Sequence, residues 1–159
     1  MQANPEFDRR PLPKAFVGAL SERFGPRFSL AQAVRAHHGH DESHFPDALP
    51  DAVVFARDAD EVVFIVGACR AHGVPIIPFG VGSSLEGHIL AVRGGITVDL
   101  SEMNQVLAIH AEDMDAVVQP GVTRKQLNDA LKGTGLFFPI DPGADATLGG
   151  MAATRASGT

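Results

Sequence analysis

The sequence contains no tryptophan, no tyrosine and a single cysteine, and each shortage excludes a class of function. Without Trp and Tyr, the chain lacks the usual aromatic platforms on which single-stranded nucleic acids stack. A lone Cys69 cannot build a disulfide framework, so a reducing compartment fits best. No apolar run approaches the roughly 20 residues that span a bilayer, and residues 1–10 lack the apolar stretch of a secretory signal. We therefore expect a cytoplasmic protein.

Clusters of basic residues are missing as well. The formal net charge of −6 at pH 7 argues against a nucleic-acid partner, because surfaces that bind nucleic acid concentrate positive charge. The 159 residues, 45% of them hydrophobic, suffice to bury the core of one globular domain.

Glycine, by contrast, is plentiful, and residues 75–87 read Pro-Ile-Ile-Pro-Phe-Gly-Val-Gly-Ser-Ser-Leu-Glu-Gly. The apolar, β-branched residues within 74–77 predict a buried strand at the start of this stretch. Gly80 and Gly82 allow main-chain N–H groups to converge without an intervening Cβ, which is typical of anion-binding loops. No Lys or Arg occurs from residue 75 to residue 92, so amide dipoles would hold any bound phosphate.

Three kinds of loop share this composition. A Rossmann fingerprint needs G-x-G-x-x-G running directly into a helix, but here Gly87 comes too late and residues 87–95 are too rich in glycine. A P-loop needs Gly-Lys-Ser/Thr, which is absent. A plain glycine turn between strands remains an alternative at this point.

Two helices are predicted near the N-terminus, one over residues 14–24 and a short one beginning at Ser29. Their inner faces would be formed by spaced apolar residues, namely Phe16, Val17, Leu20 and Phe24, then Leu30, Ala33 and Val34. The polar stretch 37–44 follows and holds four histidines and two carboxylates. Such a cluster can indicate a metal site, but its irregular spacing favours a solvated helix end and loop.

From residue 51 the pattern alternates between strand and helix. Residues 52–56 predict a buried strand, and Asp58 with Glu61 indicates the start of a helix that ends at Gly73. Its apolar face would comprise Val62, Val63, Ile65, Val66 and Cys69, with the cysteine as a packing residue rather than a nucleophile. The glycine-rich stretch then lies at the carboxyl end of a strand–helix–strand unit, where α/β folds commonly bind ligands.

Further along, the sequence predicts a strand over residues 95–100 and a hairpin with strands at 106–110 and 116–119. A helix capped by Thr123 and Gln126 should follow. The apolar residues of this part would be buried as the helix face Leu127, Ala130 and Leu131 and as the short segment 137–140.

A second glycine-rich region occupies residues 141–159 and consists largely of small residues. Thr147 is placed to cap a short helix, whose free N–H groups would attract an anion. Two such regions, far apart in one α/β chain, are better explained as two walls of one elongated cofactor site than as unrelated turns.

Three motifs resemble the FAD-binding domain of the vanillyl-alcohol oxidase / p-cresol methylhydroxylase (PCMH-type) family, in its branch of FAD-dependent D-lactate dehydrogenases and glycolate oxidase flavoprotein subunits. They are Pro-Phe-Gly-Val-Gly-Ser-Ser-Leu-Glu-Gly at 78–87, Val-Val-Gln-Pro-Gly-Val-Thr at 117–123, and Asp-Pro-Gly-Ala-Asp-Ala-Thr-Leu-Gly-Gly-Met-Ala-Ala-Thr-Arg-Ala-Ser-Gly-Thr at 141–159. Residues 38–43, His-Gly-His-Asp-Glu-Ser, also resemble the lead-in to that domain, which further weakens the metal interpretation. The resemblance implies an α+β, two-subdomain PCMH-type fold that is incomplete at its C-terminus. An N-terminal helical segment would span residues 1–47, and a truncated FAD-binding domain residues 48–159.

The resemblance also implies which residues contact FAD, in one group around the pyrophosphate and two later groups near the flavin. They are Pro78, Phe79, Gly80, Val81, Gly82, Ser83 and Ser84; Asp141, Pro142, Gly143, Ala144, Asp145, Ala146 and Thr147; and Thr154, Arg155, Ala156 and Ser157. Some relatives attach the flavin covalently through a histidine at the position of Ser83. Serine cannot form that bond, so FAD should be non-covalent. The resemblance assigns no catalytic residue within this chain and no metal.

By resemblance, the chain is the FAD-binding part of a dehydrogenase that oxidises a D-2-hydroxy acid of the D-lactate or glycolate type by hydride transfer to FAD. A quinone or a cytochrome would accept the electrons, which is compatible with peripheral contact to the inner membrane. The alternative is a truncated flavin-binding or structural remnant without catalysis, because the family draws its base and any metal-binding histidines from a domain that follows the flavin domain.

Overall fold

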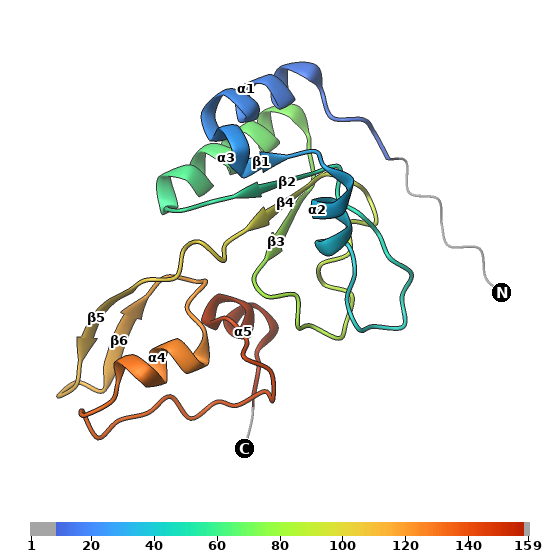
Figure 1. Ribbon diagram of the computed structural model, residues 1–159. Helices are drawn as coiled ribbons and strands as arrows, with labels where there is room; N and C mark the ends of the chain where they lie inside the picture. Colours follow the sequence, from blue (N-terminus) through green and yellow to red (C-terminus); the bar gives the residue numbers. More distant parts are fainter. Residues whose placement is uncertain (1–8, 158–159) are drawn as a thin grey trace.

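The computed structural model describes residues 9–157 and arranges them in two lobes (Figure 1). We call residues 9–103 the first lobe and residues 104–157 the second lobe. Most of the N-terminal segment that lacks signal character, residues 1–8, lies outside the described residues, as do the last two residues of the third motif. The mixed helix and sheet composition agrees with the expected α+β class.

The first lobe is built on a four-stranded sheet with the strand order β1-β2-β4-β3. Its elements are α1 (Lys14–Phe24), the short 3₁₀ turn η1 (Gly25–Arg27), β1 (Phe28–Ser29), α2 (Gln32–His37), β2 (Ala52–Phe55), α3 (Ala59–His72), β3 (Ile76–Phe79) and β4 (Ile96–Asp99). The predicted strand–helix–strand unit is confirmed, and β4 lies between its two strands. Residues 80–84 therefore leave β3 at the carboxyl edge of the parallel strands.

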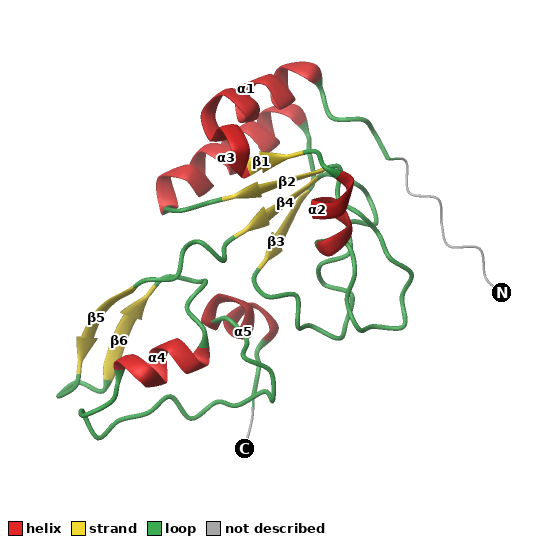
Figure 2. Ribbon diagram, in the orientation of Figure 1, coloured by secondary structure: helices red, strands yellow, loops and turns green. Residues whose placement is uncertain are grey.

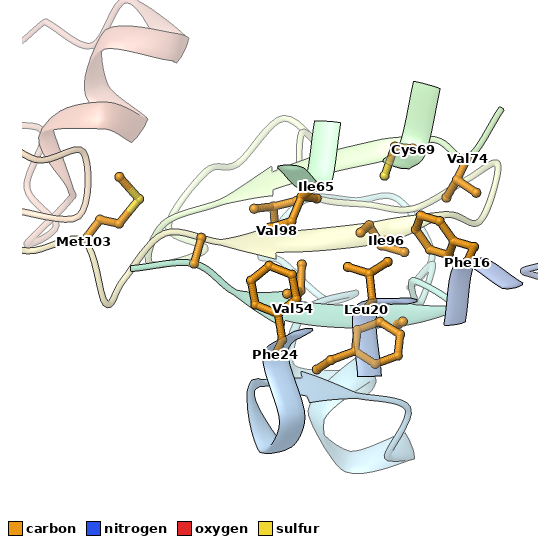
Figure 3. Packing of buried hydrophobic residues seen from close by; sticks show 13 residues of the cluster. Phe16, Leu20, Phe24, Val54, Ile65, Cys69, Val74, Ile96, Val98 and Met103 are labelled. Carbon is orange, nitrogen blue, oxygen red and sulfur yellow. The ribbon is translucent and has the colours of Figure 1, made fainter. Parts of the chain in front are cut away.

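Helices α1 and α3 cover one face of this sheet, and α2 lies on the other side (Figure 1). Apolar side chains of α1 and α3 pack against alternate residues of β2 and β4 (Figure 3), and the fully buried ones include Phe16, Leu20, Val54, Ile65 and Ile96. Burying one such side chain stabilises a fold by about 1.5–3 kcal/mol. Cys69 belongs to the same cluster, and burial raises the pKa of its thiol to about 11, in agreement with a packing role.

The predicted ends of α3 are confirmed by the hydrogen bonds that close them. The Asp58 side chain accepts from the Glu61 N–H at 2.8 Å, and Gly73 follows the helix in a left-handed conformation. The Glu61 carboxylate does not complete a reciprocal capping box. It accepts from the Arg57 N–H at 2.8 Å, one residue before the cap, and from the Arg27 guanidinium at 2.6 and 2.7 Å, and the ion pair with Arg27 connects η1 to α3.

The second lobe consists of an antiparallel hairpin, two short helices and long connections. These elements are β5 (Val106–His110), β6 (Asp115–Val118), α4 (Arg124–Ala130) and α5 (Leu148–Thr154). The predicted hairpin and both predicted helix caps are confirmed, and Thr123 with Gln126 forms a reciprocal capping box. Most of the chain between α4 and α5 is loop (Figure 2). The core of this lobe is small, with Val122, Leu127 and Leu131 as its buried side chains.

Several expectations about local structure are wrong. Ser29 begins no helix, because Phe28 and Ser29 form an edge strand beside β2 and α2 starts only at Gln32. Other residues expected on inner faces are exposed, namely Leu30, Ala33, Val63, Val66, Ile76, Ala130, Phe137 and Pro139. The reason is geometric, because a helix on a sheet and an edge strand each bury only a narrow stripe. In residues 137–140, Phe138 packs against the small core of the second lobe, whereas Phe137 and Pro139 are exposed.

The segment before residue 48 is not confined to helices and does not pack separately. Helix α1 shares a core cluster with α3, and β1 pairs with β2. The division after residue 47 stays a prediction. No helix among residues 9–157 combines the length and the apolar character that crossing a bilayer requires.

Candidate functional site

A cavity of about 500 Å³ lies between the loop that follows β3 and helix α5. We call residues 80–84 the glycine loop. Both glycine-rich regions contribute to the wall, through the predicted residues Pro78, Phe79, Gly80, Val81, Gly82, Ser83, Ser84, Pro142, Ala146, Thr147, Thr154 and Ala156. The remaining predicted residues do not line it, namely Asp141, Gly143, Ala144, Asp145, Arg155 and Ser157. Two of these are engaged elsewhere, since Asp141 pairs with Arg124 and Asp145 accepts from the Lys125 N–H.

Gly80 and Gly82 occupy positions where a larger residue does not fit. A Cβ on Gly80 would collide with the hydroxyl of Thr147, so the two walls of the cavity touch at this point. Gly82 has φ of +68°, and a Cβ there would lie 2.9 Å from the ring of Phe79. Because both conditions disfavour a side chain, main-chain atoms form this part of the wall.

The two walls differ in what their main-chain N–H groups do. Within residues 9–157, the N–H groups of residues 81–84 donate to no other protein group. The first three N–H groups of α5, Leu148 to Gly150, donate to acceptors of the same chain at 2.8, 2.9 and 3.3 Å. Thr147 caps α5 as predicted, but the expectation of free N–H groups at that helix start is wrong, because Val122 and Pro120 accept from the first two and the cap Thr147 accepts from the third.

Ionisable side chains are scarce around the cavity, and His88 is the single one among the described residues of its wall. Its Nδ1 lies 2.6 Å from Ser84 Oγ, beside the glycine loop. His88 was not among the residues predicted for the site, although it directly follows the motif that ends at Gly87. Leu100 and Pro120 were not predicted either, and they join the wall only through the tertiary fold. The described wall thus combines residues whose N–H groups have no protein acceptor with one imidazole, and it includes no carboxylate.

A second cavity, of about 690 Å³, opens between β6, α4 and α5. Its wall is mostly apolar and includes Leu136, Phe137, Phe138 and Leu148, with Arg155 as its cationic member. Helix α5 contributes to both cavities through Met151. Arg155 thus lies beside the apolar cavity rather than the one next to the glycine loop.

Two of the four histidines in the polar stretch 37–44 form hydrogen bonds at separate places. His38 Nε2 lies 2.9 Å from Asp99 Oδ2, and both side chains are buried. His40 Nδ1 lies 2.8 Å from Asp47 Oδ1 at the surface, and this hydrogen bond raises the pKa of His40. In the part of the chain that the structure describes, no three His, Cys, Asp or Glu side chains are grouped as a metal site requires.

A family model described as "FAD binding domain" matches residues 50–159. Two curated relatives are the "Probable D-lactate dehydrogenase, mitochondrial" of Danio rerio, 53% identical over 131 residues, and the "D-lactate dehydrogenase [cytochrome], mitochondrial" of Arabidopsis thaliana, 43% identical over 150 residues. These alignments cover 82% and 93% of this chain but only 26% of each relative. The chain thus spans about a quarter of the length of these relatives.

Two solved structures resemble the fold. An alkyldihydroxyacetonephosphate synthase superposes with a TM-score of 0.84 at 29% identity, covering 95% of this chain and 33% of the other. A p-cresol methylhydroxylase with substrate bound superposes with a TM-score of 0.68 at 22% identity, covering 80% of this chain and 27% of the other. The second likeness concerns the fold alone. The PCMH-type fold and the family resemblance expected from the three motifs are confirmed.

Proposed function

Because this chain belongs to the family of FAD-binding domains, we propose that the cavity beside the glycine loop holds FAD and that residues 80–84 bind its diphosphate. The observation that carries this proposal is the set of unpaired N–H groups at residues 81–84. A diphosphate is doubly negative and accepts several hydrogen bonds, and convergent amides satisfy both needs without a cationic side chain.

The other features of the wall fit the same cofactor. Gly80 and Gly82 leave no Cβ between the main chain and the cavity, and no carboxylate lines the wall. By the resemblance of residues 78–87 to the family motif, Ser83 would take the position of the histidine that tethers flavin in some relatives, and a serine hydroxyl forms no such bond. We therefore propose that FAD is held without a covalent link.

We further propose that the protein acts as a flavoprotein dehydrogenase on a D-2-hydroxy acid of the D-lactate or glycolate type. The bound flavin would supply the hydride acceptor, and this chain would position it and shield one side of it from water. The names of the two relatives support this substrate class, and one of them supports a cytochrome as electron acceptor. A quinone acceptor is the alternative and would favour peripheral contact with a membrane. A reducing, cytoplasmic compartment fits the single buried cysteine.

Catalysis also requires a base that removes the proton of the substrate hydroxyl. The described wall of the cavity offers only His88, which is already bonded to Ser84. We therefore propose that this chain binds FAD but does not oxidise a 2-hydroxy acid by itself. This is the second candidate function, a flavin-binding unit without catalysis.

FAD titration tests the site directly. Gly82→Val should weaken FAD binding at least about tenfold, because its Cβ would meet the Phe79 ring and its φ is left-handed. Ser84→Ala is the matched control in the same loop, since it keeps the main chain and removes one hydroxyl, and it should bind nearly as well as the unmodified chain. Equal affinities in the two variants would show that the glycine loop is not the diphosphate site.

The same preparation tests the remaining two points. Acid precipitation should release the flavin into the supernatant, whereas flavin that stays with the pellet would contradict non-covalent binding. Incubation with D-lactate and an artificial electron acceptor should give no steady dye reduction. Sustained turnover would mean that this chain already contains the base.

A further inference from the structure

Behind the glycine loop, the three parallel strands of the first lobe end in one row. Phe55, Asp99 and Phe79 are the last residues of β2, β4 and β3, and they pair in register with one another. Their neighbours Val54 and Val98 belong to the core under α1 and α3, so the row points to the opposite side of the sheet. This is the side on which α2 ends.

The imidazole of His38, directly after α2, contacts every residue of that row. Its ring centroid lies 4.4 Å from the Phe79 ring centroid and 5.7 Å from that of Phe55. Its Nε2 lies 2.9 Å from Asp99 Oδ2. Only 2% of His38 and 4% of Asp99 is exposed, so water does not compete for these contacts.

The orientation of the His38 ring is fixed on both sides. Nδ1 lies 2.8 Å from the Val34 carbonyl oxygen, which can only accept, so Nδ1 carries a hydrogen and donates it. Nε2 faces the Asp99 carboxylate at 2.9 Å. Turning the ring would leave buried polar atoms without partners, and such atoms are costly. The ring is therefore a rigid support.

The His38 ring stabilises the wall of the cavity. Phe79 lines the cavity and directly precedes Gly80 in the chain. Its ring packs against Gly82. The other oxygen of Asp99 accepts from the Ser101 N–H at 2.7 Å, which fixes the chain beyond Leu100, another residue of the wall. His38 and Asp99 thus stabilise the ends of β3 and β4, the two strands that lead into the cavity.

We propose that His38 is a positioning residue of the cofactor site, which acts through Asp99 and Phe79 on the shape of the glycine loop. The inference rests on the proposed FAD site. It gives a role in cofactor binding to a residue that lies outside the matched domain, residues 50–159. The physical basis is preorganisation: amides that are already fixed lose less conformational freedom when a ligand binds them.

FAD titration of the 159-residue chain provides the first test, at a temperature where circular dichroism shows each variant fully folded. His38→Leu should raise the FAD dissociation constant about tenfold, the factor that corresponds to ordering roughly one freed loop residue. The matched control is His40→Gln, because His40 forms the same kind of hydrogen bond to Asp47 with 59% of its side chain exposed. This control should bind FAD like the unmodified chain.

Variants of Asp99 separate positioning from simple support of the fold. Asp99→Asn still offers partners to Nε2 and to the Ser101 N–H, so FAD affinity should stay within about threefold of the unmodified value. Asp99→Leu offers neither and should bind as weakly as His38→Leu. Amide order parameters from ¹⁵N relaxation of the FAD-free chain should fall at residues 81–84 in His38→Leu and stay unchanged in α1.

The outcomes are distinct. If the unmodified chain binds no FAD, the proposed site and this inference both fall. If it binds FAD and His38→Leu binds equally well with unchanged order at residues 81–84, the FAD site stands and the positioning role is overturned. Should His38→Leu not fold, His38→Gln, whose amide cannot bond to Val34 and Asp99 with the geometry of the imidazole, is held to the same two criteria.

Discussion

Each lobe supplies one wall of the cavity, and the two lobes are built differently. The first lobe surrounds a four-stranded sheet with a cluster of thirteen buried residues, whereas the second lobe has a two-stranded hairpin and three buried residues in its core. The first wall therefore rests on a closed core. The second wall rests on α5 and on loops that expose apolar side chains such as Phe137.

The main-chain N–H groups of the two walls also differ, in whether they have acceptors within the protein. In the first lobe the sheet holds the glycine loop in place, so the amides of residues 81–84 can remain unpaired. In the second lobe the first two amides of α5 attach that helix to Val122 and Pro120, and the third donates to its own cap Thr147. We infer that the sheet stabilises the first wall well enough to leave the N–H groups of residues 81–84 available to a ligand. The second wall has little core beneath it, so the N–H groups at the start of α5 are needed to stabilise the fold.

Truncation of one buried leucine in each lobe would test this difference with the largest expected effect. Leu20→Ala should lower the free energy of unfolding by about 3 kcal/mol or more, because Leu20 is fully buried between α1 and the sheet. Leu131→Ala should cost roughly half as much, because its small cluster can relax toward the adjoining cavity. Urea unfolding followed by circular dichroism measures both. Equal losses would show that the second lobe is as tightly packed as the first.

An ion pair in each lobe gives a smaller contrast. Arg27 and Glu61 are bonded through both pairs of atoms, with 18% and 14% of their side chains exposed, whereas Arg124 and Asp141 share one contact with 31% and 40% exposed. Glu61→Gln should therefore lower the free energy of unfolding by about 1.5–2 kcal/mol. Asp141→Asn should cost less than about 1 kcal/mol.

The pH dependence of Glu61 has a definite sign. The hydrogen bond from Arg27 is the largest influence and lowers the pKa of Glu61 below its usual value of 4.5. The folded state therefore holds the carboxylate more strongly than the unfolded chain does, and the stabilisation is present above pH 4.5. It is lost as pH falls through the lowered folded value. Acid titration of stability should show this loss in the unmodified chain and a smaller one in Glu61→Gln, and parallel curves would contradict it.

Local features of the fold could be predicted from sequence because short-range chemistry determines them. The caps at Asp58, Thr123 and Thr147 and the stop at Gly73 each depend on residues within one helical turn. The hairpin follows from its alternating apolar residues on either side of an acidic turn. Burial was predicted less well, since Val63 and Phe137 are as apolar as their buried neighbours and only tertiary packing distinguishes them.

Long-range features of the site could not be predicted in this way. The partner of His38 is Asp99, 61 residues away, and the acceptors that occupy the first amides of α5 come from residues 120 and 122. No periodicity or spacing encodes such contacts. The position of the glycine loop was accessible because its glycines carry a conformational requirement of their own, while its support from behind became visible only with the order of the strands.

The smallest effect on stability, and the sharpest contrast in surface properties, is expected from two exposed apolar side chains. Phe137 is 73% exposed in the second lobe and Val63 is 69% exposed on α3 in the first. Phe137→Ser and Val63→Thr should each change the free energy of unfolding by less than about 0.5 kcal/mol, because little buried area is lost.

Phe137 lies at the rim of the apolar cavity of about 690 Å³, whereas Val63 lines neither cavity. A hydrophobic fluorescent dye should therefore bind the unmodified chain at the second lobe. Phe137→Ser should reduce its fluorescence and Val63→Thr should not, whereas equal reductions would place the dye on both lobes and remove this contrast between them.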